Sequence, residues 1–299
     1  MKYLFEPFVN CGAKTVAAAE KNLALFKNPI FYIFLIPAFY WLYLLFSSRM
    51  IIQYDSIGYE GLGKMIYEQG WGQYFKTGPN REPFYPLLIS LSMKISGLFS
   101  CPYYKIQTAA QLLIFALTQF LAFLIMRRCK IRTWIISVTL LYMGFSPAMV
   151  NSALSLYSEI AVYPFLLGII LFVAAAWQSL CAGIPGYKIL PYATGFALCF
   201  IVSTLTKAAF ELIFPVFLIP FLLLGLRFFL QKNFSAFKNS LVFLVAALII
   251  FYSAISGYKW LNKTYNGQFV ITDRGAWALY GNTDRRMATL TWKRFFVAL

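Results

Sequence analysis

Long apolar runs constrain this chain more than any other feature of its sequence. A helix that crosses the hydrocarbon core of a bilayer needs about 20 consecutive, mostly apolar residues. Seven stretches of this kind cover approximately residues 29–48, 104–126, 133–150, 157–177, 190–206, 208–230 and 239–257. The sequence therefore predicts an all-α fold, a polytopic transmembrane helical bundle with about seven spans.

The composition agrees with this class and argues against a soluble basic protein. Hydrophobic residues make up 61% of the chain and charged residues only 12%, whereas soluble domains carry about 45–50% and about 25%. The net charge of +16 would suggest nucleic acid on a soluble protein, but no soluble basic domain is present to carry that function. We therefore expect the membrane as a partner, and no nucleic acid.

The basic loops predict an orientation. Lys and Arg concentrate in short cytoplasmic loops, and the clearest clusters are Arg127–Arg132 and Arg227–Lys238. If both lie inside, the lead-in 1–28 is cytoplasmic, whereas the loop 47–103 and the segment 258–299 lie outside. Eight of the ten carboxylates then fall on the outer face. This asymmetry indicates that the outer face is the functional one.

Two amphipathic helices are expected within the outer loop. In the first, Ile57, Leu62, Met65 and Ile66 form one apolar face, and Gly70 ends the helix. The second apolar segment, from Pro83 onward, is too short for a span. We expect both helices to lie along the membrane surface.

The absence of histidine limits the available chemistry. It removes His-based zinc sites and Ser-His or Cys-His catalysis. The five cysteines form no CxxC pair, so a disulfide framework or a cysteine metal site is not indicated. Proton transfer must therefore rest on Asp, Glu, Lys, Tyr or Cys.

Asp55 is the first candidate. It follows the first predicted span by a few residues, where one-sided desolvation raises the pKa of a carboxylate toward that of a general base. Asp is also favoured at a helix N-cap, and the next helix is expected to begin near residue 57. The sequence leaves both roles open.

Glu159 and Lys207 lie at the outer ends of predicted spans. Glu159 lies at the start of a predicted span, where burying an ionisable group costs free energy and such groups are usually functional. Alternatively, its carboxylate stabilises the N-terminus of the helix. Lys207 precedes Glu211 by four residues, so the two could pair along one helix face. Alternatively, Lys207 faces a lipid phosphate.

Arg81 and Glu82 precede the second amphipathic helix. Arg81 could bind an anionic headgroup while Glu82 orients a partner. The alternative is a solvated ion pair between these neighbours.

Four features in chain order carry a resemblance to a known family. They are Asp55 with the helix ending at Gly70, the Pro83–Pro86 entry (PFYP) to a helix ending in Ser96-Gly97, Pro147 followed by Ser158-Glu159, and Gly195 followed by Leu205-Thr206-Lys207. In this order the features resemble membrane glycosyltransferases of the C superfamily (GT-C). The bacterial group similar to protein O-mannosyltransferases and the lipid A aminoarabinose transferase is nearest in pattern.

The resemblance implies a function and a role for each residue. Residues 29–257 would form a transmembrane glycosyltransferase domain in the plasma (inner) membrane. It would transfer a sugar from a polyprenyl-phosphate donor to a lipid, glycan or protein acceptor at the extracytoplasmic face. Asp55 would be the base or the acceptor-orienting carboxylate, and Glu159 a second carboxylate. Substrate-binding residues would be Arg81, Glu82, Tyr85 and Lys207.

Two departures from the family pattern accompany the resemblance. Family members often have Arg where this chain has Lys207, and they usually continue with more spans and a soluble outer domain. Residues 258–299 are therefore expected to begin a truncated C-terminal part. No cofactor is certain, and a divalent metal stays open without a clear ligand set.

Two other classes remain as alternatives. A transporter or lipid flippase would place charges near the bilayer midplane and break helices in repeated halves. A non-catalytic membrane subunit would need no converging polar side chains. The enzyme hypothesis predicts that Asp55, Arg81 and Glu159 converge at one outer cavity.

Overall fold

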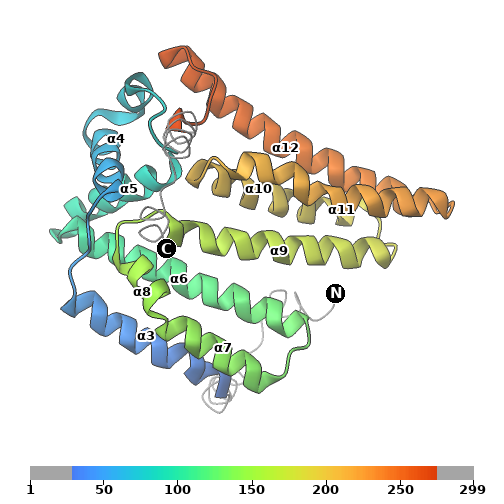
Figure 1. Cartoon of the computed structure of the whole chain (residues 1–299), viewed down its shortest axis with the longest axis horizontal. Coiled ribbons are helices and arrows are strands. Elements are labelled where there is room, and N and C mark those ends of the chain that lie inside the picture. Colours follow the sequence, from blue (N-terminus) through green and yellow to red (C-terminus); the bar gives the residue numbers. More distant parts are fainter. Residues whose placement is uncertain (1–28, 275–299) are drawn as a thin grey trace, which may run out of the picture.

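The computed structural model describes residues 29–274, and the regular elements of this part of the chain are all helices (Figure 1). Its elements are α3 (Pro29–Ser47), α4 (Asp55–Thr77), α5 (Phe84–Phe99), α6 (Tyr103–Arg128), α7 (Thr133–Phe145), α8 (Pro147–Leu154), α9 (Glu159–Cys181), η2 (Gly186–Lys188), α10 (Leu190–Thr206), α11 (Phe210–Leu230) and α12 (Phe234–Asn266). The all-α prediction is confirmed for these residues. The predicted cytoplasmic lead-in 1–28 lies outside the described residues.

Five of the helices are long and apolar enough to cross a membrane. They are α6, α9, α10 together with η2, α11 and α12. A sixth span results if α7 and α8, which meet at an angle of 46°, form one broken span. The apolar helix α3 is shorter by the same measure. Five or six spans can therefore be assigned between residues 29 and 274, and the count of seven stays a prediction.

The break between α7 and α8 is stabilised within the protein. Pro147 occupies the start of α8, where its fixed φ angle fits and its missing N–H costs nothing. The Trp41 indole N–H donates to the carbonyl of Gly144 at 2.8 Å. A carbonyl that the break leaves without its helical donor is thus satisfied by a neighbouring helix.

The helices form two connected halves (Figure 1). On one side α3 packs against α7 and α6, and α6 packs against α9. On the other side α9 and α12 both pack against α10, and α12 also packs against α11. The helix α9 therefore joins the two halves.

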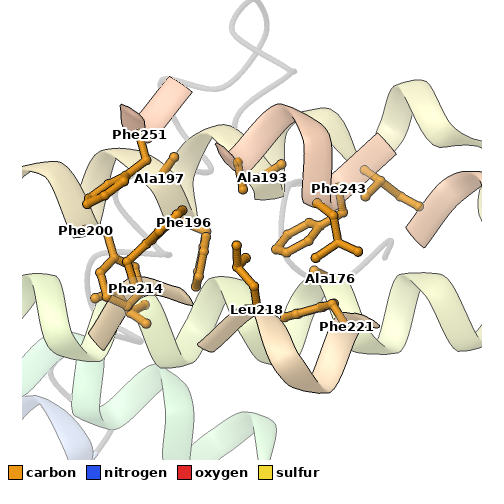
Figure 2. Packing of buried hydrophobic residues seen from close by; sticks show 14 of the residues in the cluster. Ala176, Ala193, Phe196, Ala197, Phe200, Phe214, Leu218, Phe221, Phe243 and Phe251 are labelled. Carbon is orange, nitrogen blue, oxygen red and sulfur yellow. The ribbon is translucent and has the colours of Figure 1, made fainter. Parts of the chain in front are cut away.

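Phenylalanines fill the core of the second half (Figure 2). The rings of Phe214 and Phe251 stack with centroids 3.8 Å apart, and those of Phe221 and Phe243 with centroids 4.1 Å apart. Small residues such as Ala176 lie between them. Small side chains let helices approach closely, which is the main source of packing energy between helices in lipid.

The helices α4 and α5 pack on each other at one end of the bundle, with α5 against α6 and α4 against α12. The sequence correctly predicts two helices here, and the buried face of α4 includes Leu62 and Ile66 of the predicted face. It consists of Tyr59, Leu62, Gly63 and Ile66, while Ile57 is 63% exposed.

Two helix ends differ from the prediction. Gly70, at φ 79°, kinks α4 but does not end it, and a second helical segment continues to Thr77. The helix α12 continues beyond the predicted limit near residue 257 to Asn266, where Gly267 provides the left-handed cap. The segment after Gly70 contains the buried Tyr74 and Phe75, so the glycine does not mark the end of α4. In α12 the helix continues beyond its apolar run into polar residues, so a pattern based on apolar runs underestimates its length.

The carboxylates of the described chain lie at one end of the bundle, whereas Lys and Arg occur at both ends. The end that carries α4 and α5, named here the acidic end, holds every carboxylate between residues 29 and 274: Asp55, Glu60, Glu68, Glu82, Glu159, Glu211 and Asp273. The opposite end, named the basic end, holds Arg127, Arg128, Lys130, Arg132, Lys188, Arg227, Lys232 and Lys238. This segregation matches the predicted distribution of charge between the two faces.

Candidate functional site

The candidate site lies at the acidic end and is assembled from three separate parts of the chain. The loop between α4 and α5 carries Arg81, and its carbonyl accepts a hydrogen bond from the Tyr74 hydroxyl at 2.8 Å. The segment after α12 returns to this loop, where the Asp273 N–H donates to the Pro79 carbonyl at 3.0 Å. Residues from both ends of the described chain therefore meet beside the start of α4.

Asp55 lies between two arginines. Arg81 Nη2 is 2.9 Å from Asp55 Oδ1, and Arg274 Nη2 is 3.3 Å from Asp55 Oδ2. The Arg81 side chain is only 13% exposed, while those of Asp55 and Arg274 are 49% and 44% exposed. The Arg81 guanidinium also lies 4.6 Å from the centre of the Tyr59 ring, a cation–π arrangement that fixes its plane.

The electrostatics of Asp55 are opposite to the expectation from sequence. The hydrogen bond from Arg81 lowers the pKa of Asp55 to about 2; partial burial opposes this effect, and the charges of Arg81 and Arg274 add to it. The raised pKa predicted from one-sided desolvation is therefore wrong. Asp55 also forms no side-chain cap, because Tyr54 occupies the N-cap position.

A second ion pair lies at the start of α9. Lys207 Nζ is 2.8 Å from Glu159 Oε1. Burial lowers the pKa of Lys207, but the hydrogen bond to Glu159 and the electrostatic effects of Tyr59, Glu159 and Glu82 together outweigh burial, and the pKa is raised. Lys207 therefore remains a cation, while Glu211 pairs with Lys259 at 2.5 Å. The alternative of a Lys207–Glu211 pair along one helix face is wrong.

Glu82 anchors the turn that carries Lys207. Its Oε1 accepts a hydrogen bond from the Ala208 N–H at 3.0 Å, and the residue is only 7% exposed. Its Oε2 is buried and has no hydrogen-bond partner among the described residues. Neither Arg81 nor Glu82 forms the solvated pair considered from sequence, because each binds a different segment.

Tyr59 joins the two ion pairs. The Ser158 hydroxyl, next to Glu159, donates to the Tyr59 hydroxyl at 3.2 Å, and Arg81 lies over the same ring. Tyr85 packs edge-on against Tyr59 with centroids 5.2 Å apart. The candidate residues from α4, the following loop, α5 and α9 thus belong to one continuous network.

Tyr85 supports this network. It is fully buried, and its hydroxyl donates to Gln111 Oε1 at 2.7 Å. Burial raises the pKa of Tyr85 well above its usual value, so the hydroxyl stays protonated and bound to Gln111. The structure thus places Tyr85 behind Tyr59, and its expected role in binding substrate stays a prediction.

An open pocket of about 540 Å³ adjoins the Asp55–Arg81 pair. Its lining residues come from α4, the loop after it and the returning segment: Ile57, Gly58, Gly61, Leu62, Asn80, Arg81, Asp273 and Arg274. A Cβ at Gly58 would lie 3.4 Å from Arg81 Nε, so glycine leaves room for the guanidinium. Glu159 and Lys207 do not line this pocket. Their ion pair is connected to it through Tyr59, which contacts both Ser158 and Arg81.

The pocket offers cations rather than a metal site. Between residues 29 and 274 no group of three or more His, Cys, Asp or Glu side chains is placed to hold a metal ion. Arg81 Nη1 is buried and has no hydrogen-bond partner in the described chain. The two arginines that line the pocket are suited to bind phosphate oxygens.

Sequence reasoning missed Arg274 and Tyr59. Arg274 lies 219 positions after Asp55, and no spacing rule connects residues so far apart. Tyr59 could have been found from the i, i+3, i+4, i+7 pattern that it shares with Leu62, Gly63 and Ile66.

Comparisons of the whole chain with protein-family models, curated proteins and solved structures found no match. The resemblance to GT-C glycosyltransferases is therefore not tested by any relative. What can be argued about function comes from the geometry of the acidic end.

Proposed function

We propose that this protein is a membrane glycosyltransferase that moves a sugar from a polyprenyl-phosphate donor to an acceptor at the extracytoplasmic face. One observation carries the proposal: an ionised carboxylate, Asp55, is held between two arginines beside a pocket of about 540 Å³.

The reaction needs a good leaving group. As the acceptor oxygen forms a bond to the anomeric carbon, the bond to the phosphate oxygen breaks and its electrons stay on polyprenyl phosphate. Preorganised cations stabilise this developing charge. Arg81 and Arg274, which both line the pocket, would perform this role. Lys207, on the far side of Tyr59 from the pocket, would add a positive charge that also stabilises the phosphate.

Asp55 would orient the acceptor rather than act as a strong base. Its pKa of about 2 means that it is fully ionised at neutral pH and accepts a hydrogen bond from the acceptor hydroxyl. The acceptor proton would pass to the Asp55 carboxylate only as the bond to the anomeric carbon forms, because the acceptor hydroxyl becomes acidic at that point. Of the two roles suggested by the resemblance, the lowered pKa favours the orienting one.

The position of the pocket fits a lipid-borne donor. Large apolar side chains on and around α4 and α5 face outward, including Tyr54, Ile57, Leu98 and Phe99. Such side chains are suited to the interface between acyl chains and headgroups. With α4 and α5 on the membrane surface, the lipid tail would stay in the bilayer while the phosphate enters the pocket.

A transporter or flippase is the second candidate, and the broken α7–α8 pair is the observation that favours it. The carbonyl of Gly144 at this break is bound by Trp41, however, and does not line a path. The charges on the five clear spans also lie near their ends. The glycosyltransferase proposal accounts for more of the polar groups.

Proteoliposomes that contain the purified full chain would test the proposal. A panel of radiolabelled polyprenyl-phosphate sugars is supplied with candidate acceptors, and the release of polyprenyl phosphate is measured. We expect release from the wild type and at least tenfold less when Arg81 and Arg274 are both replaced by Ala, because each charge-assisted hydrogen bond contributes about 1.5–3 kcal/mol. Movement of intact donor between leaflets, with no release of polyprenyl phosphate, would instead identify a flippase.

A further inference from the structure

A second pocket lies at the basic end, far from the candidate glycosyl-transfer site. It has a volume of about 460 Å³ and is formed by the connection from α9 to α10 and the first turns of α12. Lys238 and Ser235 line it from α12, and Tyr187 lines it from η2. None of the carboxylates between residues 29 and 274 lies at this end.

The wall of this pocket is held by a specific contact. Asn239 is buried, and its Nδ2 donates to the Ile184 carbonyl at 2.8 Å. A Cβ at Gly186 would lie 2.9 Å from Asn239 Oδ1, so a larger residue there would require the Asn239 side chain to shift. The pocket is therefore a defined feature of the packing between η2 and α12.

The polar groups of the pocket are suited to an anion. Lys238 forms no ion pair with any described residue. The neighbouring Lys188 lies 5.7 Å from the centre of the Tyr187 ring, which adds a second positive charge beside the pocket. The N-terminus of α12, where Asn233 Oδ1 accepts a hydrogen bond from the Ala236 N–H at 3.1 Å, also favours negative charge.

The remaining lining is apolar and continues along the bundle. Leu190 and Val242 line the pocket, and exposed apolar residues such as Leu241 and Val245 follow on α12. A ligand that fits both parts has an anionic phosphate group and an attached hydrocarbon chain. We propose that this pocket binds the headgroup of an anionic glycerophospholipid, with its acyl chains along α10 and α12.

Native mass spectrometry of the detergent-solubilised full chain would test this site. The probes are phosphatidylglycerol and phosphatidylcholine with identical acyl chains. We expect a preference for phosphatidylglycerol that falls about fivefold in Lys238→Ala, because one lysine near an anionic lipid surface contributes roughly that factor. Lys238→Arg should keep the preference. Lys238 is exposed, so these variants are expected to fold.

Arg227→Ala is the matched control, because Arg227 is an exposed residue of the basic end that does not line the pocket. It should keep the lipid preference of the wild type. An equal loss in Arg227→Ala would show that diffuse charge, not the pocket, binds the lipid. Equal binding of both lipids by the wild type would overturn the proposal. Displacement of the lipid by an equal concentration of glycerol phosphate would assign the pocket to a water-soluble ligand and also overturn it.

Discussion

Replacing Asp55 by Asn removes the negative charge proposed to act in catalysis but can keep the hydrogen bond from Arg81. Asn has the same shape, and its side-chain oxygen can still accept from Arg81, which now donates to Asp55 at 2.9 Å. The Asp55 side chain is 49% exposed, and exposed ion pairs contribute about 0–1 kcal/mol. We therefore expect the free energy of unfolding to change by less than about 1 kcal/mol.

The effect on sugar transfer should be much larger. A positioned carboxylate that accepts the acceptor proton contributes about 10²–10⁴-fold to the rate, which corresponds to a barrier change of about 2.7–5.4 kcal/mol. Release of polyprenyl phosphate in proteoliposomes should fall by at least about 100-fold. Thermal unfolding in detergent would be measured on the same preparation.

Glu68→Gln provides the matched control. Glu68 lies on the same helix, is 47% exposed and contacts only the exposed Lys64, at 3.7 Å. The charge change is identical, but transfer should stay at the wild-type rate. Wild-type rates in Asp55→Asn, or an equal loss in Glu68→Gln, would refute the role assigned to Asp55.

Three further predictions follow from the same contacts. Arg81→Lys keeps the charge but loses the planar guanidinium and one charge-assisted hydrogen bond, so transfer should fall roughly 10- to 100-fold; an unchanged rate would show that a point charge is enough. The pKa of Asp55 is lowered to about 2 from 3.8, so its charge is lost only as the pH falls through that window. The pH profile of transfer should therefore show no inflection from Asp55 between pH 5 and 8, and an inflection there that disappears in Asp55→Asn would contradict the assignment. Gly63→Ala would place a Cβ 2.6 Å from Ile89 Cγ2 and should destabilise the α4–α5 contact by about 1–3 kcal/mol; Gly72→Ala, which meets open space, should not lower the thermal midpoint, and equal shifts in both variants would disprove the close contact.

The helices could be predicted because each depends on a short stretch of sequence. An apolar run in lipid must satisfy its own backbone hydrogen bonds, so a helix is the only solution for an isolated segment. The apolar runs therefore located α6, α9, α10, α11 and α12 closely. Their ends were less predictable, because the last turn of α12 is polar and its cap is the single residue Gly267.

The pairings within the site could not be predicted in the same way. Sequence correctly indicated that Asp55, Arg81, Glu159 and Lys207 would share one end of the bundle. It did not indicate which cation would face which carboxylate, because the pairs join residues between 26 and 219 positions apart. The sign of the pKa shift of Asp55 depends on those partners, so it was predicted wrongly.

The return of Arg274 to Asp55 has a consequence for biosynthesis. The two residues are 219 positions apart, and ribosomes add about 5–20 residues per second. A nascent chain thus carries Asp55 for roughly ten to forty seconds before its second arginine has been translated. The helices α6, α9, α10, α11 and α12 are therefore all translated before Arg274 can pair with Asp55.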